Sequence, residues 1–301
     1  MGKGMLTTAV CGDIFASPGV DAILTAIINV SGDKGCLLIV KNYTGDSLNF
    51  GLAAEKARAL GYSVEWVTVS DDIVLSDNPQ PRGIAGTALV HKIVGYAAAE
   101  VKSLQEVANA ARAVIEATSS IGVAFSSCHL PGDQQVKPGR SEPGMGIHGE
   151  PGVTTLGTQS SQQIVTLLSE KLQAHDKDRE VVLLINNLGG FSSLEMGVLA
   201  REVLHSPLGH NVQQLIAPAT LVSALDMKGF SLSILALSDY FKEMLCSPVE
   251  ASGWQMPIAL QFAQVTEGKK IPILPRGMPS ENSSVANVVE TIRRTSLVLE
   301  N

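Results

Sequence analysis

The sequence predicts an α/β protein in which buried strands alternate with amphipathic helices. Hydrophobic residues make up 45% of its 301 residues and charged residues 17%, which is enough apolar material for a core. Aromatic residues are only 4%, so Val, Leu, Ile and Ala must fill that core, as they do around buried parallel strands. Polar or Gly-rich loops follow several of the strand-like segments. These observations predict two α/β units, each with its own sheet, whose loops at strand ends form a ligand crevice.

The first unit is predicted to begin with a strand, a helix and a second strand. Residues 6–15 are β-like, and the helix is expected to start at Ser17-Pro18, because Ser caps free amides and Pro fits the first helical position. Apolar residues recur at helical spacing over residues 23–30. The apolar run of residues 36–40 has strand length and indicates a strand covered on both faces.

A polar loop, residues 41–46, follows that apolar strand. In open α/β sheets ligands bind at the carboxyl ends of strands, so Asp46 is a candidate general base in the crevice. Asp46 also precedes a predicted helix over residues 47–60, which Gly61 ends. There its carboxylate would instead cap the free amides of the first turn. The sequence leaves both roles open.

The rest of the first unit continues as strand and helix. Residues 62–69 are predicted to form a strand, and residues 70–86 a loop rich in Asp, Pro and Gly that is long enough to be functional or partly mobile. Residues 86–118 are expected to form one long Ala-rich helical region. His91 lies on an apolar stretch of this region, and we interpret it as a structural histidine whose hydrogen bonds are satisfied.

A second unit is predicted to begin at Ser119. Residues 1–118 then form the first, N-terminally incomplete unit, and residues 119–275 form the second. The expected strands of the second unit are residues 121–127, 180–185, 212–216 and 230–237, and its expected helices are residues 162–173 and 194–204. Residues 276–301 are polar with a short helix-like end, which is typical of a linker or tail.

The most distinctive stretch is the loop of residues 139–153, which contains His148. Glycines and prolines are too dense there for a helix or a strand interior, and glycine lets a ligand approach the backbone closely. Glu142 and Glu150 are near enough in sequence to orient the imidazole and fix its tautomer. The loop therefore either presents His148 to a ligand or is a tight surface turn with an incidental histidine.

A second group of small polar residues follows the strand predicted at 180–185. These residues are Asn186, Asn187, Gly189 and Gly190. Amide side chains and glycines directly after a strand mark the rim of a crevice, so all four are candidate ligand contacts. A tight turn explains them at least as well, because Asn tolerates the left-handed backbone conformation.

Composition argues against several other functions. The formal charge is −7 and the pI near 5.4, without a basic cluster, so neither nucleic acid nor an anionic membrane surface is an expected partner. No apolar run could span a membrane and no signal peptide pattern occurs, so we expect a cytoplasmic protein. The four cysteines lie far apart, which predicts scattered buried thiols and neither a disulfide nor a metal site. Neither a P-loop nor a Rossmann fingerprint is present.

Six motifs together resemble the dihydroxyacetone kinase family, in its substrate-binding domain. They are Gly2-Lys3-Gly4-Met5-Leu6-Thr7, Phe15-Ala16-Ser17-Pro18, Lys41-Asn42-Tyr43-Thr44-Gly45-Asp46-Ser47-Leu48-Asn49-Phe50, Gly86-Thr87, Gly144-Met145-Gly146-Ile147-His148-Gly149-Glu150-Pro151-Gly152 and Asn186-Asn187-Leu188-Gly189-Gly190. The two longest motifs are ungapped and stand in the family's order. The resemblance runs over nearly the whole chain.

The resemblance implies a specific chemistry. The family's nucleophile falls at His148, which would attack the ketone carbon of dihydroxyacetone (glycerone) and hold it as a covalent hemiaminal. The family's base falls at Asp46, which would take the proton from the terminal hydroxyl that attacks the γ-phosphate. Lys41 and Ser17 match positions that contact or border the substrate. The same carbonyl trap would accept glyceraldehyde or 3,4-dihydroxy-2-butanone.

The resemblance also implies partners. ATP and Mg²⁺ would be bound by a helical nucleotide-binding domain, in cis or in trans, and a homodimer is expected because the family is dimeric. The family normally has a further segment before Gly2 that carries a second catalytic histidine. We therefore expect a truncated form of a single-chain kinase. The alternative is a truncated, non-catalytic module that binds a triose or a partner protein.

Overall fold

The computed structural model describes residues 1–74, 80–100, 102–126, 128, 142–143, 160–175, 179–261, 268 and 281–299. These residues belong to two units, residues 1–260 and residues 261–301. The second unit contributes helix α8 (Ser283–Leu299), within the range that we expected to be a polar linker with a helical end. Both sheets of the described chain lie in the first unit.

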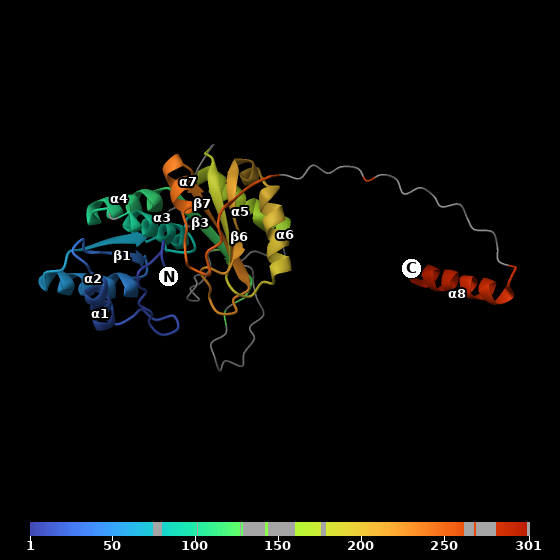
Figure 1. Cartoon of the computed structure of the whole chain (residues 1–301), viewed down its shortest axis with the longest axis horizontal. Coiled ribbons are helices and arrows are strands. Elements are labelled where there is room, and N and C mark those ends of the chain that lie inside the picture. The colour runs from blue at the N-terminus through green and yellow to red at the C-terminus, as the bar shows by residue number, and fades with distance from the viewer. Residues whose placement is uncertain are drawn as a thin grey trace. The chain divides into compact units, whose positions relative to one another are not determined.

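The first sheet has two parallel strands between two layers of helices (Figure 1). Its strands are β1 (Cys36–Lys41) and β2 (Val64–Val69), and its helices are α1 (Val20–Val30), α2 (Thr44–Ala59), α3 (Thr87–Ala99) and α4 (Leu104–Glu116). α1 and α2 cover one side of the sheet, and α3 and α4 cover the other. Parallel strands need both faces covered because βα connections place helices there, which explains the continuous apolar run that the sequence shows in β1.

The second sheet has six strands in the order β4-β3-β7-β5-β6-β8. Its elements are β3 (Thr118–Ala124), β4 (Glu142–Pro143), β5 (Val181–Asn187), β6 (Val212–Ala219), β7 (Gly229–Ala236) and β8 (Ile258–Ala259), with helices α5 (Ser161–His175), α6 (Ser193–Leu204) and α7 (Asp239–Leu245) and the short 3₁₀ helix η1 (Pro207–Asn211). Only β5 and β6 are parallel, whereas β7 is antiparallel to both β3 and β5. The expectation of parallel strands thus holds for the first sheet and fails for most of the second.

The two sheets share a core. Val67 of β2, Val182 of β5 and Leu235 of β7 belong to one buried apolar cluster. Just after β2, Asp72 forms a parallel bridge with Ser120 of β3, which connects the two sheets directly. The α/β fold with two sheets is confirmed; the unit boundaries at residues 118/119 and 275/276 stay predictions.

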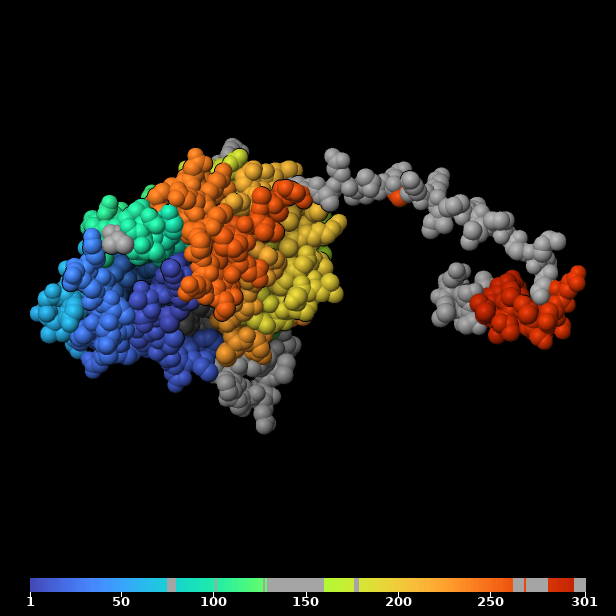
Figure 2. Space-filling model, viewed as in Figure 1, coloured from blue at the N-terminus to red at the C-terminus, as the bar shows by residue number. Residues whose placement is uncertain are grey.

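One expected element of the first unit was wrong, and another is divided. Residues 6–15 form no strand, because their backbone pairs with no other strand in the described chain. The residues before them, 2–5, pack between α3 and residues 248–251. There the Glu250 N–H donates to the Lys3 carbonyl at 2.9 Å. Figure 2 shows these N-terminal residues against the segment near residue 250. The helical region expected over 86–118 contains two helices, α3 and α4. α4 begins anew because Ser103 and Glu106 form a capping box.

The cysteines were also predicted incorrectly in one respect. All four are free, as expected, but Cys11 and Cys246 are exposed and Cys36 and Cys128 are half-buried, so none is a fully buried thiol. No helix in the described ranges is long and apolar enough to cross a membrane.

Candidate active site

The candidate site is built at the carboxyl end of β1. Lys41 is the last residue of β1, and its ammonium lies 5.8 Å from the centre of the Tyr43 ring. Burial lowers the pKa of Lys41, while the nearby carboxylates of Asp46 and Asp71 raise it. The lysine is therefore a half-buried cation between two carboxylates, at the sheet edge where α/β proteins bind ligands.

Asp46 lies in the first turn of α2. The helix begins at Thr44 and its N-cap is Tyr43, so Asp46 neither precedes the helix nor caps it; the capping interpretation was wrong, and so was a helix start at residue 47. The Asp46 side chain makes no hydrogen bond or ion pair to the described residues. A half-buried carboxylate with no such partner, stabilised by the positive end of a helix, is available to accept a proton from a ligand.

Ser17 adjoins the same helix turn. α1 starts later than expected, with Gly19 as its N-cap, which leaves Ser17 in the connecting segment. A Cβ placed on Gly45 would lie 2.6 Å from the Ser17 hydroxyl oxygen, so this hydroxyl contacts the backbone directly beside Asp46. The Asn49 side chain donates to the Pro18 carbonyl at 2.9 Å and fixes the approach of the two segments. Ser17 is thus a neighbour of Asp46 in space.

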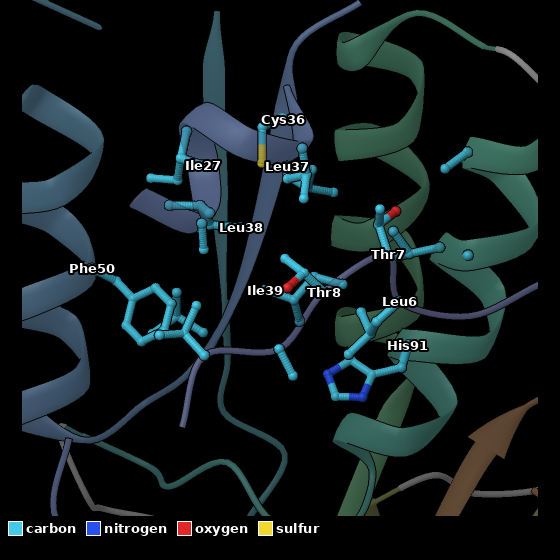
Figure 3. Close-up of a pocket in the computed structure, with 18 of the residues that line it drawn as sticks. Leu6, Thr7, Thr8, Ile27, Cys36, Leu37, Leu38, Ile39, Phe50 and His91 are labelled. Carbon is cyan, nitrogen blue, oxygen red and sulfur yellow. The ribbon is translucent and has the colours of Figure 1, made fainter. Parts of the chain in front are cut away.

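Lys41 and Asp46 line one cavity of about 630 Å³. It lies along β1, and its other walls come from α1, α3 and the N-terminal residues 5–11. Figure 3 shows Leu6, Thr7 and Thr8 passing between β1 and α3, with Phe50 on the opposite side. The walls are mostly apolar, with a few polar side chains that include Lys41 and Asp46, which is typical of sites for small ligands.

His91 of α3 was misinterpreted from the sequence. We expected its hydrogen bonds to be satisfied, yet it makes none to the described residues, and its ring lines the cavity beside Leu6 (Figure 3). Burial, the Lys41 cation and the N-terminal ammonium lower its pKa to about 4. His91 is therefore a neutral imidazole near the Lys41 end of the cavity. Thr87, one helical turn earlier, lines the same cavity and carries a buried hydroxyl without a partner in the described chain.

The crevice-rim residues Asn186 and Asn187 use their amides internally. The Asn186 amide donates to the Val222 carbonyl at 2.8 Å and accepts from the backbone N–H groups of Leu221 and Val222 at 2.9 and 3.0 Å. The Asn187 amide donates to the Phe191 carbonyl at 2.8 Å and accepts from Gly189 N–H at 2.9 Å. These bonds fit the tight-turn alternative.

The glycines of this turn are required by its backbone. Gly189 has a φ of 128°, which only glycine adopts without strain. A Cβ on Gly190 would lie 2.5 Å from the Asp226 carbonyl oxygen. Gly189 and Gly190 therefore shape the end of β5 through backbone contacts.

The loop of His148 lies outside the described residues, apart from Glu142 and Pro143 in β4. The expected presentation of His148 to a ligand accordingly stays a prediction. Within the described ranges, no group of three or more His, Cys, Asp or Glu side chains could hold a metal ion. Sequence reasoning missed Asp71, although it lies just beyond the predicted strand of residues 62–69, as Lys41 lies just beyond the apolar run of residues 36–40.

A parallel sheet between two layers of helices, with a cavity that reaches Lys41 and Asp46 at the carboxyl end of β1, is typical of a domain that binds a small molecule. The Dak1 domain family matches residues 1–253. The chain therefore belongs to the dihydroxyacetone kinase family, as a Dak1 domain.

The similarity extends to whole relatives. Dihydroxyacetone kinase of Citrobacter freundii is 51% identical over the whole chain, which spans 55% of that kinase, and its crystal structure matches with a TM-score of 0.89 over 96% of this chain and 54% of its own. The dihydroxyacetone-binding subunit DhaK of a PTS-dependent kinase from Listeria innocua is 39% identical, over 84% of this chain and 81% of the subunit. A dihydroxyacetone kinase operon co-activator, Dha-DhaQ, is 31% identical with a TM-score of 0.79, over 84% of this chain and 82% of its own. The chain thus spans about half of the Citrobacter kinase.

Proposed function

We propose that this chain is the substrate-binding domain of a dihydroxyacetone kinase, which captures dihydroxyacetone and presents its terminal hydroxyl to the γ-phosphate of ATP. The observation that carries the proposal is the shared cavity of Lys41 and Asp46 at the carboxyl end of β1, in a chain that is 51% identical to the Citrobacter kinase. The product would be dihydroxyacetone phosphate.

Capture is assigned to His148. A ring nitrogen adds to the ketone carbon, the carbonyl oxygen gains a proton and becomes a hydroxyl, and the imidazole loses its N–H proton. The resulting hemiaminal holds a small and weakly bound substrate in place, which supplies proximity for the next step. Glycerol has no carbonyl carbon and would not be captured.

Phosphoryl transfer is assigned to Asp46. Its carboxylate takes the proton of the terminal hydroxyl as that oxygen attacks the γ-phosphorus and ADP leaves. The Lys41 ammonium, close enough to Asp46 for their charges to interact, orients the carboxylate or the substrate hydroxyl. Ser17, against Gly45, borders the same turn and limits the space beside the hydroxyl.

The phosphoryl donor would come from a separate domain. The Citrobacter kinase has been crystallised with AMP-PNP and Mg²⁺. By similarity, ATP and Mg²⁺ would be bound by a helical nucleotide-binding domain, fused in cis or supplied in trans. A homodimer and a cytoplasmic location remain expectations of the same resemblance.

Capture can be tested without a phosphoryl donor. Dihydroxyacetone labelled with ¹³C at its ketone carbon is added to the chain, and a new protein-bound tetrahedral carbon resonance is expected by NMR. His148→Ala should remove this resonance, whereas His210→Ala, a change at an exposed histidine of η1, should leave it. A wild-type chain that gives no tetrahedral carbon at saturating substrate would contradict the proposal.

A second candidate is a binding module that does not take part in phosphoryl transfer. The likeness to the operon co-activator Dha-DhaQ over most of both chains favours it. The two candidates differ when a nucleotide-binding domain of a relative is added with ATP and Mg²⁺. A kinase domain then forms dihydroxyacetone phosphate, whereas a binding module holds the labelled ketone unchanged.

A further inference from the structure

A buried carboxylate beside the candidate site has no role in the proposed chemistry. Asp71 follows β2 by two residues, and its side chain is only 2% exposed. Its Oδ1 accepts from Ile84 N–H at 2.8 Å, its Oδ2 accepts from Gly86 N–H at 2.8 Å, and the Ser120 hydroxyl also hydrogen-bonds to it. Burying a carboxylate is costly unless donors of this kind compensate it, so its place needs an explanation.

The first consequence of these bonds is that Asp71 fixes the start of α3. Gly86 is the N-cap of α3, and a Cβ there would lie 2.5 Å from the Asp71 Oδ2. The anion therefore sits against the amide end of the helix that carries Thr87 and His91, where the helix dipole favours a negative charge. Only a glycine at position 86 lets the carboxylate approach this closely.

The second consequence is that the segment bonded to Asp71 forms the wall behind Lys41. A Cβ on Gly83 would lie 3.0 Å from the Lys41 Cβ and 2.6 Å from the Val69 carbonyl oxygen. The Asn42 side chain donates to the Pro81 carbonyl at 2.7 Å, which holds the other end of the segment to the residue after Lys41. Residues 81–86 thus lie against Lys41 and Asn42, and Asp71 holds this segment through Ile84 and Gly86.

The third observation is electrostatic. Two carboxylates, Asp46 and Asp71, raise the pKa of Lys41 against the effect of burial. The Tyr43 ring also lies near the ammonium, and the lysine charge in turn lowers the pKa of His91. Asp72, the adjacent buried carboxylate, is instead paired with Arg82 at 2.8 Å. Of the adjacent residues Asp71 and Asp72, it is therefore Asp71 whose charge acts on Lys41.

We propose that Asp71 is a positioning residue for the acceptor site: its carboxylate holds residues 83–86 against Lys41 and places a second negative charge, besides that of Asp46, near the lysine ammonium. It does not touch the substrate. It acts through Lys41 and through the start of α3, and the proposal rests on the proposed function only where it concerns turnover.

The decisive variant is Asp71→Asn, with Asp72→Asn as the matched control. The ¹³Cε resonance of Lys41, assigned by its loss in Lys41→Arg, is titrated in the 301-residue chain labelled at lysine. Asp71→Asn should lower the Lys41 pKa because it removes a nearby negative charge, and Asp72→Asn should leave it unchanged. An unchanged Lys41 pKa in Asp71→Asn, or an equal shift in both variants, would overturn the proposal.

A measurement on the wild-type chain guards against a variant that does not fold. The backbone amides of Ile84 and Gly86 report protonation of Asp71, because they donate to it. On acidification, the chemical shifts of these two amides should change with a single midpoint pH. The ¹³Cε chemical shift of Lys41 should show a step at the same pH. Burial raises the pKa of Asp71, so this midpoint should lie above that of an ordinary carboxyl group. A Lys41 resonance that shows no step at this midpoint would refute the electrostatic link.

Turnover provides the functional arm. With a nucleotide-binding domain and ATP supplied, Asp71→Asn should reduce kcat by about tenfold or more, because small misplacements of a catalytic group are costly, and should leave ketone capture intact. An unchanged kcat in a folded Asp71→Asn variant would contradict the positioning role. If the wild-type chain neither captures nor phosphorylates the ketone, the proposed function fails, while the lysine titration still decides the role of Asp71.

Discussion

Ser17 and Gly45 touch at the first turn of α2: a Cβ on Gly45 would lie 2.6 Å from the Ser17 hydroxyl oxygen but 3.4 Å from its Cβ. The contact places the segment before α1 against the turn that carries Asp46. Alanine at position 45 would therefore require the Ser17 hydroxyl to rotate away or its segment to shift.

This contact predicts a double-mutant effect. Gly45→Ala alone should disturb the Ser17 segment and lose some or all of the helix propensity gain of about 1 kcal/mol that alanine offers over glycine. In a Ser17→Ala background the clash is gone, so the same change should stabilise the chain. Urea unfolding of the four proteins gives the coupling free energy. Equal effects of Gly45→Ala in both backgrounds would show that the two residues do not interact.

Asp46→Asn should separate capture from transfer. The change keeps the shape of the side chain but removes its basicity, and loss of a general base typically costs on the order of 10²–10⁴ in rate. We therefore expect normal hemiaminal formation and greatly slowed phosphorylation when the nucleotide-binding domain and ATP are present. Asp21→Asn, at an acidic residue in the first turn of α1, is the matched control. Normal turnover by Asp46→Asn would show that Asp46 is not the general base.

His91 should make the chain less stable in mild acid. Its folded-state pKa is lowered to about 4 from 6.5. Below pH 6.5 the unfolded chain binds a proton that the folded chain refuses, so stability falls from pH 6.5 to about 4 and levels off below that. The loss is at most about 3 kcal/mol. The difference in unfolding free energy between wild type and His91→Gln should change between pH 6.5 and about 4. A difference that does not depend on pH would show that folding leaves the pKa of His91 unchanged.

Lys92 should make stability rise with pH as well, but in the alkaline range. It is fully buried in α3, and its ammonium donates to the Met244 carbonyl at 2.6 Å and contacts the Ser247 hydroxyl. Burial lowers its pKa to about 8 from 10.5. Between these values the unfolded chain retains a proton that the folded chain has released, so stability due to this group rises with pH. Comparison with Lys92→Met, which has no titratable group there, isolates the effect, and a flat difference between pH 8 and 10.5 would contradict it.

The local pattern of the sequence determined the elements whose signal is strong over a short range. The apolar run of residues 36–40 became β1, and the periodic residues 23–30 became most of α1. A strand of this kind ends where its apolar run ends, so the polar residues after it, Lys41 and Asp46 among them, could be assigned to a ligand-binding edge. This needs only side-chain burial and backbone hydrogen bonding, both of which a short stretch encodes.

Tertiary structure decided what depends on distant partners. Residues 6–15 have β-like composition but pair with no strand among the described residues. Asp46 lies inside α2 instead of before it, because Tyr43 is the N-cap. The strand directions of the second sheet follow from connections that no local pattern encodes. Asp71 lies in a predicted loop, yet its carboxylate accepts hydrogen bonds from the backbone amides of Ile84 and Gly86. These bonds form only when the segment of residues 83–86 folds back beside the end of β2. Hydrogen bonds and charges over such sequence separations exist only in the folded chain, and for that reason the sequence alone indicated where the site lies but not which groups hold it in place.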